Sequence, residues 1–301
     1  MRVLLYFRKK EINRKNDMYT NYEQMNTFIK IKEREFQLIS KLVYSNFGIN
    51  LTDKKKALIE GRLNKVLKNY GYKSFQDYYN AILEDKTGEL LTLLIDKLST
   101  NHTFFFRERE HYDFMWNTAL KEIVNRGLET NKKEIRIWSA GCSTGEELYS
   151  VAILLFEYFG EDIVNWDIGL LGTDISISVL RTAIEGSYDT ESIKGLSKYY
   201  INKYFTKKGD NHIQIKDDIK KLVLFKSLNL MQNYFPFRGK FDIIFCRNVM
   251  IYFDTDIQYK LVNKLGDYTK KGAYLFTGHS ESLNKKNTQF FYVKPAIYSK
   301  I

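Results

Sequence analysis

The stretch that decides the fold is IRIWSAGCSTGEE, residues 135–147. Its apolar first part, Ile135 to Trp138, is typical of a buried strand, and a run of small residues with glycines at 141 and 145 follows. Glycine lets the backbone approach a ligand closely, and a helix that begins directly after such a turn presents free N–H groups. The stretch therefore predicts a strand, a tight turn and a helix, the arrangement with which doubly wound α/β proteins hold nucleotide-like cofactors.

Strands and helices alternate from residue 135 onward. Runs typical of strands lie at 135–138, 168–173, 223–227, 241–246 and 273–277, with terminal strands in 288–301, and helical periodicity lies near 145–159, 176–184 and 254–269. This alternation predicts a mostly parallel sheet with helices on both faces. The pattern stops at about 187–226, which indicates an insertion with a helix and a small antiparallel hairpin.

The N-terminal part has a different pattern. Residues 28–110 show helical spacing, with a second helix that we expect to begin at Asp53 and end at Gly71, and with a capping box formed by Ser74 and Asp77. The sequence therefore predicts a helical N-terminal domain at 28–110 and an α/β domain at 111–301. Residues 1–27 have no clear period and are predicted to be a disordered extension.

The composition limits the classes of protein. The chain has 301 residues, 44% hydrophobic and 28% charged, which is ordinary for a globular protein of one or two domains. It contains no run long enough to span a membrane and no signal peptide, so we expect a cytoplasmic protein without membrane insertion. Two cysteines and four histidines, none at the spacing of metal ligands, argue against a metal centre.

The net charge of +11 is concentrated near the N-terminus. Residues 1–75 hold 17 Lys and Arg against 7 Asp and Glu, whereas the remainder is nearly balanced. This asymmetry indicates an acidic partner, either nucleic acid or an acidic protein; the alternative is a solvated helix face without a partner. The candidate docking residues on the second helix are Lys54, Lys55, Arg62 and Lys65.

Three features are expected to converge at one edge of the sheet. The first is the glycine turn with Glu146, and the second is Asp174, where a carboxylate can accept both hydroxyls of a ribose. Asp174 has an alternative role as a helix cap. The third is the polar end of the strand 241–246, at Arg247 and Asn248. Together they outline an S-adenosylmethionine-dependent methyltransferase; a nicotinamide enzyme shares the first two features but would usually carry a third glycine.

The sequence resembles the CheR-type glutamate O-methyltransferases of chemotaxis receptors over about residues 30–300. The resemblance is carried by six segments in family order: LSTNHTFFFRERE at 98–110, RIWSAGCSTGEELYS at 136–150, GTDIS at 172–176, SLNL at 227–230, FDIIFCRNVMIYFD at 241–254 and GHSESL at 278–283. It implies a Rossmann-like methyltransferase domain with an all-α N-terminal domain and a small antiparallel β insertion.

The resemblance also implies the site. S-adenosylmethionine would be the cofactor, S-adenosylhomocysteine the product, and no metal would take part. Glu146 is expected to meet the methionine amino group, Asp174 the ribose, and Tyr252 the region of the methyl group. The residues expected to border the cofactor are Asn101, Thr103, Arg107, Gly141, Glu146, Asp174, Asn229, Leu230, Asn248 and Val249.

The reaction implied is attack of a glutamate carboxylate on the sulfonium methyl group. Glutamate is already ionised at neutral pH, so no general base is needed. Arg107 is the candidate for orienting the carboxylate, because its planar guanidinium matches that group. The alternative for Arg107 is a surface salt bridge with Glu108 or Glu110, and for Tyr252 it is core packing.

The implied substrate is the acidic cytoplasmic signalling domain of chemoreceptors, onto which a basic helix would steer the enzyme. Some family members also grip a receptor's C-terminal peptide with the insertion. The loop at 207–211 here is short and lacks Gly-x-Gly, which argues against such tethering. The competing hypotheses are a nucleic-acid methyltransferase, whose Asn-Pro-Pro-aromatic motif is absent, and a non-catalytic module that binds S-adenosylmethionine.

Overall fold

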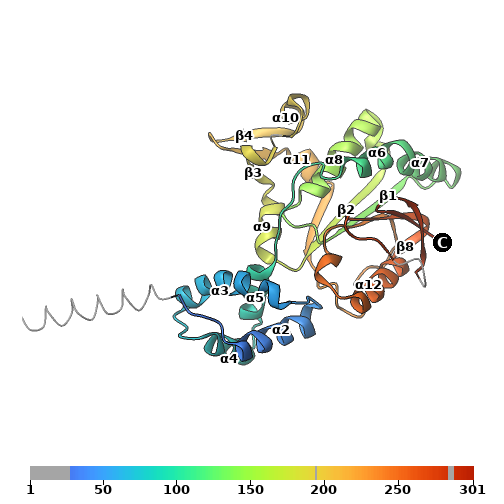
Figure 1. Cartoon of the computed structure of the whole chain (residues 1–301). Helices are drawn as coiled ribbons and strands as arrows, with labels where there is room; N and C mark the ends of the chain where they lie inside the picture. The colour runs from blue at the N-terminus through green and yellow to red at the C-terminus, as the bar shows by residue number, and fades with distance from the viewer. Residues whose placement is uncertain (1–27, 194, 284–287) are drawn as a thin grey trace, which may run out of the picture. The chain divides into compact units, whose positions relative to one another are not determined.

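The computed structural model describes residues 28–193, 195–283 and 288–301, so the predicted extension at 1–27 lies outside the described residues. The described chain forms two compact units (Figure 1): one contains residues up to Leu42 and Leu51–Leu98, the other Val43–Asn50 and Ser99–Ile301. The boundary therefore falls before Ser99 and not at residue 110. The reason is that the segment after Ser99 is hydrogen-bonded to the α/β unit, at Asn101 and Phe106.

The first unit consists of helices that bury apolar side chains at three- and four-residue spacing. Its elements are most of α2 (Glu33–Phe47), the short helix η1 (Asp53–Lys55), α3 (Lys56–Tyr70), α4 (Phe75–Glu84) and α5 (Glu89–Leu98). The Ser74 hydroxyl accepts the Asp77 amide, which confirms the predicted cap of α4. The predicted Asp53 cap is wrong: a 3₁₀ turn precedes α3, and no side chain caps either helix start.

The second unit is a seven-stranded sheet in the order β6-β2-β1-β7-β8-β10-β9. The strands are β1 (Glu134–Ala140), β2 (Asp167–Asp174), β6 (Val223–Ser227), β7 (Phe241–Cys246), β8 (Thr269–Thr277), β9 (Phe290–Lys294) and β10 (Ile297–Lys300). The first five pair in parallel, and β10 pairs antiparallel with both β8 and β9. The sheet that the alternation predicts is confirmed, with an antiparallel edge.

Side chains alternate along the buried strands, so each strand presents apolar residues on both faces of the sheet. Helices pack against these residues and cover both faces. Ile137 and Phe245 pack in one apolar cluster with α6 (Arg109–Phe114), α7 (Leu120–Glu129) and α8 (Glu146–Phe159). Trp138 and Ile244 pack in a second cluster with α12 (Thr255–Asp267). Figure 1 shows α6, α7 and α8 on one side of the strands and α12 on the other. A π-helical turn, η2 (Met115–Ala119), joins α6 to α7.

The remaining elements complete the second unit. After α8 the short helix η3 (Gly160–Asn165) leads into β2, and α9 (Ile177–Glu185) follows β2. The predicted small antiparallel sheet is confirmed, with the order β3-β5-β4. Its elements are β3 (Ser187–Asp189), η4 (Thr190–Ile193), α10 (Lys198–Tyr204), β4 (Phe205–Lys208) and β5 (His212–Ile215), followed by α11 (Asp217–Lys220). The turn η5 (Met250–Tyr252) follows β7, and no helix in the described ranges is long and apolar enough to cross a membrane.

Candidate cofactor and catalytic site

The strand order places the candidate site at the carboxyl ends of β1, β2 and β7. The chain runs outward from β1 to β2 and β6 on one side, and to β7 and β8 on the other, so the order reverses beside β1. Ligands of open α/β sheets bind in the crevice at such a reversal. The glycine turn, Asp174 and the Arg247–Asn248 end of β7 all belong to this edge, as the sequence predicts.

The glycine turn is held open by backbone conformation. Gly141 has a φ of 92°, which disfavours any residue with a side chain. A Cβ atom there would also lie 2.3 Å from Cγ2 of Val249. The amides of Gly141 and Cys142 donate to the Thr173 carbonyl at 2.8 and 2.9 Å. The turn is thus attached to β2 and packed against Val249, so two predicted cofactor-bordering residues are in contact.

Asp174 connects the end of β2 to the glycine turn. Its Oδ2 accepts the Ser143 amide at 2.9 Å, and its Oδ1 accepts the Ser176 amide at the same distance. The cap of α9 is Ser176, whose hydroxyl accepts the Val179 amide. Asp174 is therefore not the N-cap, and its half-buried carboxylate lies at the strand tip where the sequence predicts a ribose acceptor.

Glu146 is an acidic residue that is almost completely buried. Only 4% of the residue is exposed, and Thr144 Oγ1 donates to Oε2 at 2.6 Å. Burial raises the pKa of this carboxyl, although the Thr144 hydrogen bond acts in the opposite direction. A buried carboxylate without a cation gains stability when a positively charged group binds beside it, which fits the amino group of a methionine moiety.

The segment from Thr100 to Glu108 is attached to several elements. Ser143 Oγ donates to the Asn101 carbonyl at 3.2 Å, and Tyr252 Oη donates to the Thr100 carbonyl at 3.2 Å. The Phe106 amide donates to Ser150 Oγ of α8 at 2.9 Å. The segment, which contains Arg107, is thus hydrogen-bonded to the glycine turn, to Tyr252 and to α8.

Arg107 itself is half-buried. Its Nη1 donates to the His102 carbonyl at 2.8 Å, and its guanidinium lies 5.8 Å from the Phe104 ring centroid. Among the described residues no acidic side chain pairs with it, so the alternative of a salt bridge with Glu108 or Glu110 is not formed there. A cation without a carboxylate partner at this edge can receive one from a substrate.

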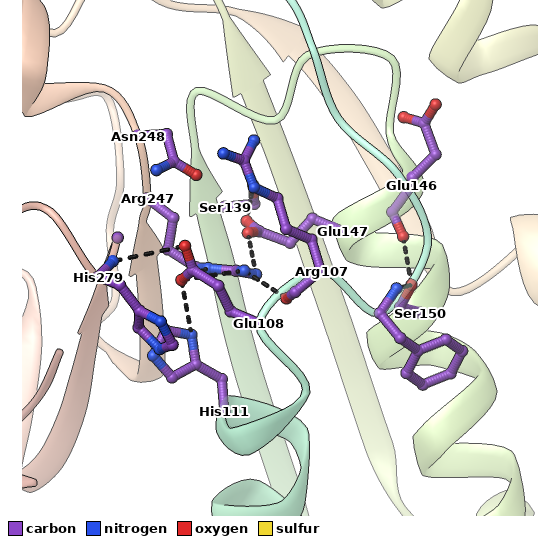
Figure 2. Close-up of polar contacts among 12 residues, drawn as sticks. Arg107, Glu108, His111, Ser139, Glu146, Glu147, Ser150, Arg247, Asn248 and His279 are labelled. Atoms are coloured by element: carbon purple, nitrogen blue, oxygen red, sulfur yellow. Dashed lines mark hydrogen bonds and ion pairs between the residues drawn. The ribbon is translucent and has the colours of Figure 1, made fainter. Parts of the chain in front are cut away.

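The sequence places Arg247 at the polar end of β7 but does not indicate its ion pairs. Its side chain is 2% exposed and forms ion pairs with Glu108 at 3.3 Å and Glu147 at 2.9 Å. Its Nη2 also donates to the Arg107 carbonyl (Figure 2). Burial disfavours the charge, but Glu147, Tyr112 and Glu108 more than offset this, and the pKa of Arg247 lies above its ordinary value. Arg247 therefore holds the backbone at Arg107 to β7 and α8.

Glu281 organises the turn after β7 in a similar way. Its carboxylate accepts the amides of Asn248 at 2.8 Å, Gly278 at 2.6 Å and Ile251 at 3.1 Å. Asn248 has a φ of 57°, an uncommon conformation for a residue with a side chain. Burial raises the pKa of Glu281, against the lowering by these amides. Glu281 thus positions Asn248, which is predicted to border the cofactor.

The other predicted cofactor residues lie around the same edge. The Asn229 side chain makes two hydrogen bonds. Its Nδ2 donates to the Asn46 carbonyl at 2.7 Å, and its Oδ1 accepts from the Met231 backbone amide at 2.9 Å. Leu230 is 9% exposed and packs in the cluster of Trp138. Thr103 is half-buried. Both cysteines are buried in the apolar clusters, where they pack as small apolar residues, and burial raises the pKa of each thiol.

The docking residues belong to the first unit. Lys54 and Lys65 are exposed and Lys55 is half-buried. Arg62 has a structural role there, because its Nη1 donates to the carbonyls of Lys97 at 3.5 Å and Leu98 at 2.8 Å, at the end of α5.

Residues 101–298 match the family described as CheR methyltransferase, SAM binding domain, and residues 34–99 match CheR methyltransferase, all-alpha domain. Together with the strand order of the sheet, these two matches identify the protein as an S-adenosylmethionine-dependent methyltransferase. The chain belongs to the CheR family. It is 50% identical to the chemotaxis protein methyltransferase of Borreliella burgdorferi, over 94% of this chain and 100% of that one.

Two further relatives agree with this assignment. The chain is 36% identical to the chemotaxis protein methyltransferase of Vibrio anguillarum, over 91% of this chain and 99% of that one. It is 32% identical to the chemotaxis protein methyltransferase of Escherichia coli, over 92% and 94% of the two chains. These matches do not favour the nucleic-acid methyltransferase alternative.

Proposed function

We propose that the protein transfers a methyl group from S-adenosylmethionine to glutamate side chains in the cytoplasmic signalling domain of chemoreceptors, forming methyl esters. The observation that carries the proposal is the attachment of the 100–108 segment to both the glycine turn and Tyr252, through Asn101 and Thr100. We infer that this attachment holds Arg107, which has no acidic partner among the described residues, at the edge where the cofactor class binds. Membership of a chemotaxis methyltransferase family supports the choice of receptor.

The residues at the edge fit the cofactor. Glu146 is a buried carboxylate without a cationic partner among the described residues, and Asp174 places a half-buried carboxylate at the end of β2. We assign the amino group of the cofactor to Glu146 and its ribose hydroxyls to Asp174. The remaining residues proposed to border it are Asn101, Thr103, Arg107, Asn229, Leu230, Asn248 and Val249. When bound, the cofactor supplies an electrophilic methyl group.

The protein's part in the reaction is alignment. A glutamate with a pKa near 4.3 is ionised at neutral pH and needs no general base. Arg107 donates to one carboxylate oxygen and leaves the other free to attack, because a guanidinium that engaged both oxygens would weaken the nucleophile. Tyr252, fixed by its bond to Thr100, lies beside the reacting groups. Correct alignment of two reactants supplies roughly 7–11 kcal/mol of the barrier.

The deciding experiment uses S-adenosylmethionine with a labelled methyl group, the protein, and membranes that contain chemoreceptors. We expect label on a receptor band that is released as methanol by mild alkali, since carboxyl methyl esters are base-labile. A receptor whose acceptor glutamates are replaced by alanine is the control and should stay unlabelled. Base-stable label, or label on RNA, would contradict glutamate methylation and favour the nucleic-acid hypothesis.

Docking of the receptor is assigned to Lys54 and Lys65 on the exposed side of the first unit. The variant K54E/K65E should raise the KM for receptor two- to fivefold at low salt, because exposed charges act mainly on association and are screened by salt. The affinity for S-adenosylmethionine should not change. Reversal of Lys208, which pairs with Glu185 outside this unit, is the control. Equal receptor kinetics in both variants would contradict the docking role.

A further inference from the structure

Three potential metal ligands converge beside Arg247: Glu108 and His111 lie three residues apart, and His279 comes from a distant part of the chain. Glu108 comes from the end of the 100–108 segment, His111 from α6, and His279 from the turn after β8. One ligand atom of each lies within 4.8 Å of the others. Figure 2 shows the two imidazole rings next to the Glu108 carboxylate. The spacing along the chain, from which we expected no metal centre, does not reveal this group.

Of these three residues, His111 is the one that is fully buried. The residue is 0% exposed, and neither ring nitrogen has a hydrogen-bond partner among the described residues. Its Nδ1 lies 3.6 Å from Glu108 Oε2, which is longer than a hydrogen bond. The large majority of buried polar side-chain atoms are paired, so a buried imidazole with two unpaired nitrogens indicates a missing partner.

The donor set suits a metal ion of the zinc class. Two imidazoles and one carboxylate are a common set of three protein ligands for zinc, with the fourth position left to solvent. Bonds of about 2.0–2.2 Å require the ligand atoms to approach one another by roughly 1 Å. His279 is exposed and Glu108 lies in a loop, so both can move toward the fixed His111, and His279 gives access from solvent.

We propose that Glu108, His111 and His279 form a binding site for a divalent zinc-class metal ion. The nearest positive charge is Arg247, which is already matched by Glu147 at 2.9 Å and so does not depend on Glu108 alone. The ion and Arg247 compete for the Glu108 carboxylate. Because Arg247 also holds the Arg107 carbonyl, an ion at this site disturbs the Arg107 segment and inhibits the enzyme; this last consequence rests on the proposed methyl transfer.

Binding is tested without reference to activity. The full chain is titrated with Zn²⁺ by calorimetry and with Co²⁺ by visible absorption, which reports nitrogen and oxygen ligands. We expect one ion per chain and a loss of affinity of at least tenfold in His279→Ala. His212→Ala is the matched control, because His212 Nδ1 also lies 3.6 Å from a carboxylate, that of Asp189, but is exposed and belongs to the small sheet.

The outcomes separate the alternatives. No stoichiometric binding by the unsubstituted chain, unchanged binding in H279A, or an equal loss in H212A would each overturn the proposal. A second variant, His111→Gln, should also lose binding, and its fold is checked by its S-adenosylmethionine affinity. Zn²⁺ should reduce methyl transfer by the unsubstituted enzyme and not by H279A at the same concentration. Binding without inhibition would overturn the competition with Arg247 and leave the site itself standing.

Discussion

Two regions border the same edge of the sheet but owe their conformations to different causes. The glycine turn at 141–145 is fixed by its own glycines and by the neighbouring strand β2, through Thr173 and Asp174. The 100–108 segment has no glycine, yet Phe106 and Glu108 adopt φ values of 54° and 57°. Conformations of this kind persist in non-glycine residues only where surrounding contacts impose them.

The contacts that impose them come from other elements. Arg247 of the β7 end holds the Arg107 carbonyl and Glu108, and Ser150 of α8 holds the Phe106 amide. The conformation of the turn therefore depends on its glycines and on hydrogen bonds to β2, whereas the conformation of the segment depends on a buried charge network. The Arg107 segment is thus held by residues outside the proposed cofactor-bordering set, so the two regions should respond differently to substitution.

The largest effect, a loss of stability, is expected from Arg247→Met. The change leaves Glu108 and Glu147 without their buried cation, and breaking such a pair costs about 3–5 kcal/mol of unfolding free energy. Urea unfolding measures it. The affinity for S-adenosylmethionine of the folded variant should fall less than kcat, because the glycine turn keeps its hydrogen bonds to β2 and only the cofactor-bordering residues of the segment are disturbed.

Arg126→Met is the matched control for this loss. Arg126 pairs with the buried Asp242, but Asp242 keeps Lys270 at 2.9 Å and the Arg136 amide at 2.9 Å. The control should therefore lose clearly less stability. A loss below 1 kcal/mol for R247M, or an equal loss in the control, would show that the segment does not depend on the Arg247 network.

The next largest effect is expected from Arg107→Ala. Removal of one preorganised donor at a reacting group lowers kcat by about 10²–10³-fold. Single-turnover methylation of a receptor fragment measures the change, and calorimetry should show S-adenosylmethionine binding within threefold of the unsubstituted protein. Arg107→Lys keeps the charge and should recover part of the rate. A loss of cofactor affinity as large as the loss of rate would contradict the proposal that the segment orients the substrate while the turn binds the cofactor.

A smaller effect in the other region is expected from Asp174→Ala. The variant removes the proposed ribose acceptor and the partner of the Ser143 amide, so S-adenosylmethionine should bind about 10–100-fold more weakly, the cost of one or two hydrogen bonds to a charged group. At saturating cofactor kcat should change little. Asp167→Ala, at the opposite end of β2, is the control and should bind normally. A large fall in kcat with unchanged affinity would place Asp174 among the residues that align the substrate.

The difference between the glycine turn and the 100–108 segment also explains what could be predicted from the sequence. The turn, β1, β2 and Asp174 lie within one continuous stretch, so apolar runs and glycines predict them and their common edge. In the first unit a local rule failed at Asp53, where a 3₁₀ turn begins the helix without a side-chain cap. The resemblance correctly indicated the family, but it carried no information on what holds Arg107 in place.

The network around Arg247 could not be predicted because its partners are distant along the chain. Glu147 and Glu108 lie 100 and 139 residues away from it. Arginine at the end of a strand has no pattern that distinguishes a buried ion pair from a solvent-exposed side chain. His111 and His279 illustrate the same limit, since only the packing of α6 against the end of β8 brings them together.

The smallest effect should follow from Ser143→Ala, which removes a side-chain bond between the two regions. Ser143 Oγ donates to the Asn101 carbonyl at 3.2 Å, while the Ser143 amide stays bonded to Asp174 in the variant. A single neutral hydrogen bond contributes about 0.5–1.5 kcal/mol, and the cofactor affinity should change less than threefold. If the regions are fixed independently, the unfolding costs of S143A and R247M add within about 0.5 kcal/mol in the double variant. A coupling above 1 kcal/mol would mean that Ser143 transmits the constraint of the Arg247 network to the glycine turn, and that the two regions form one unit.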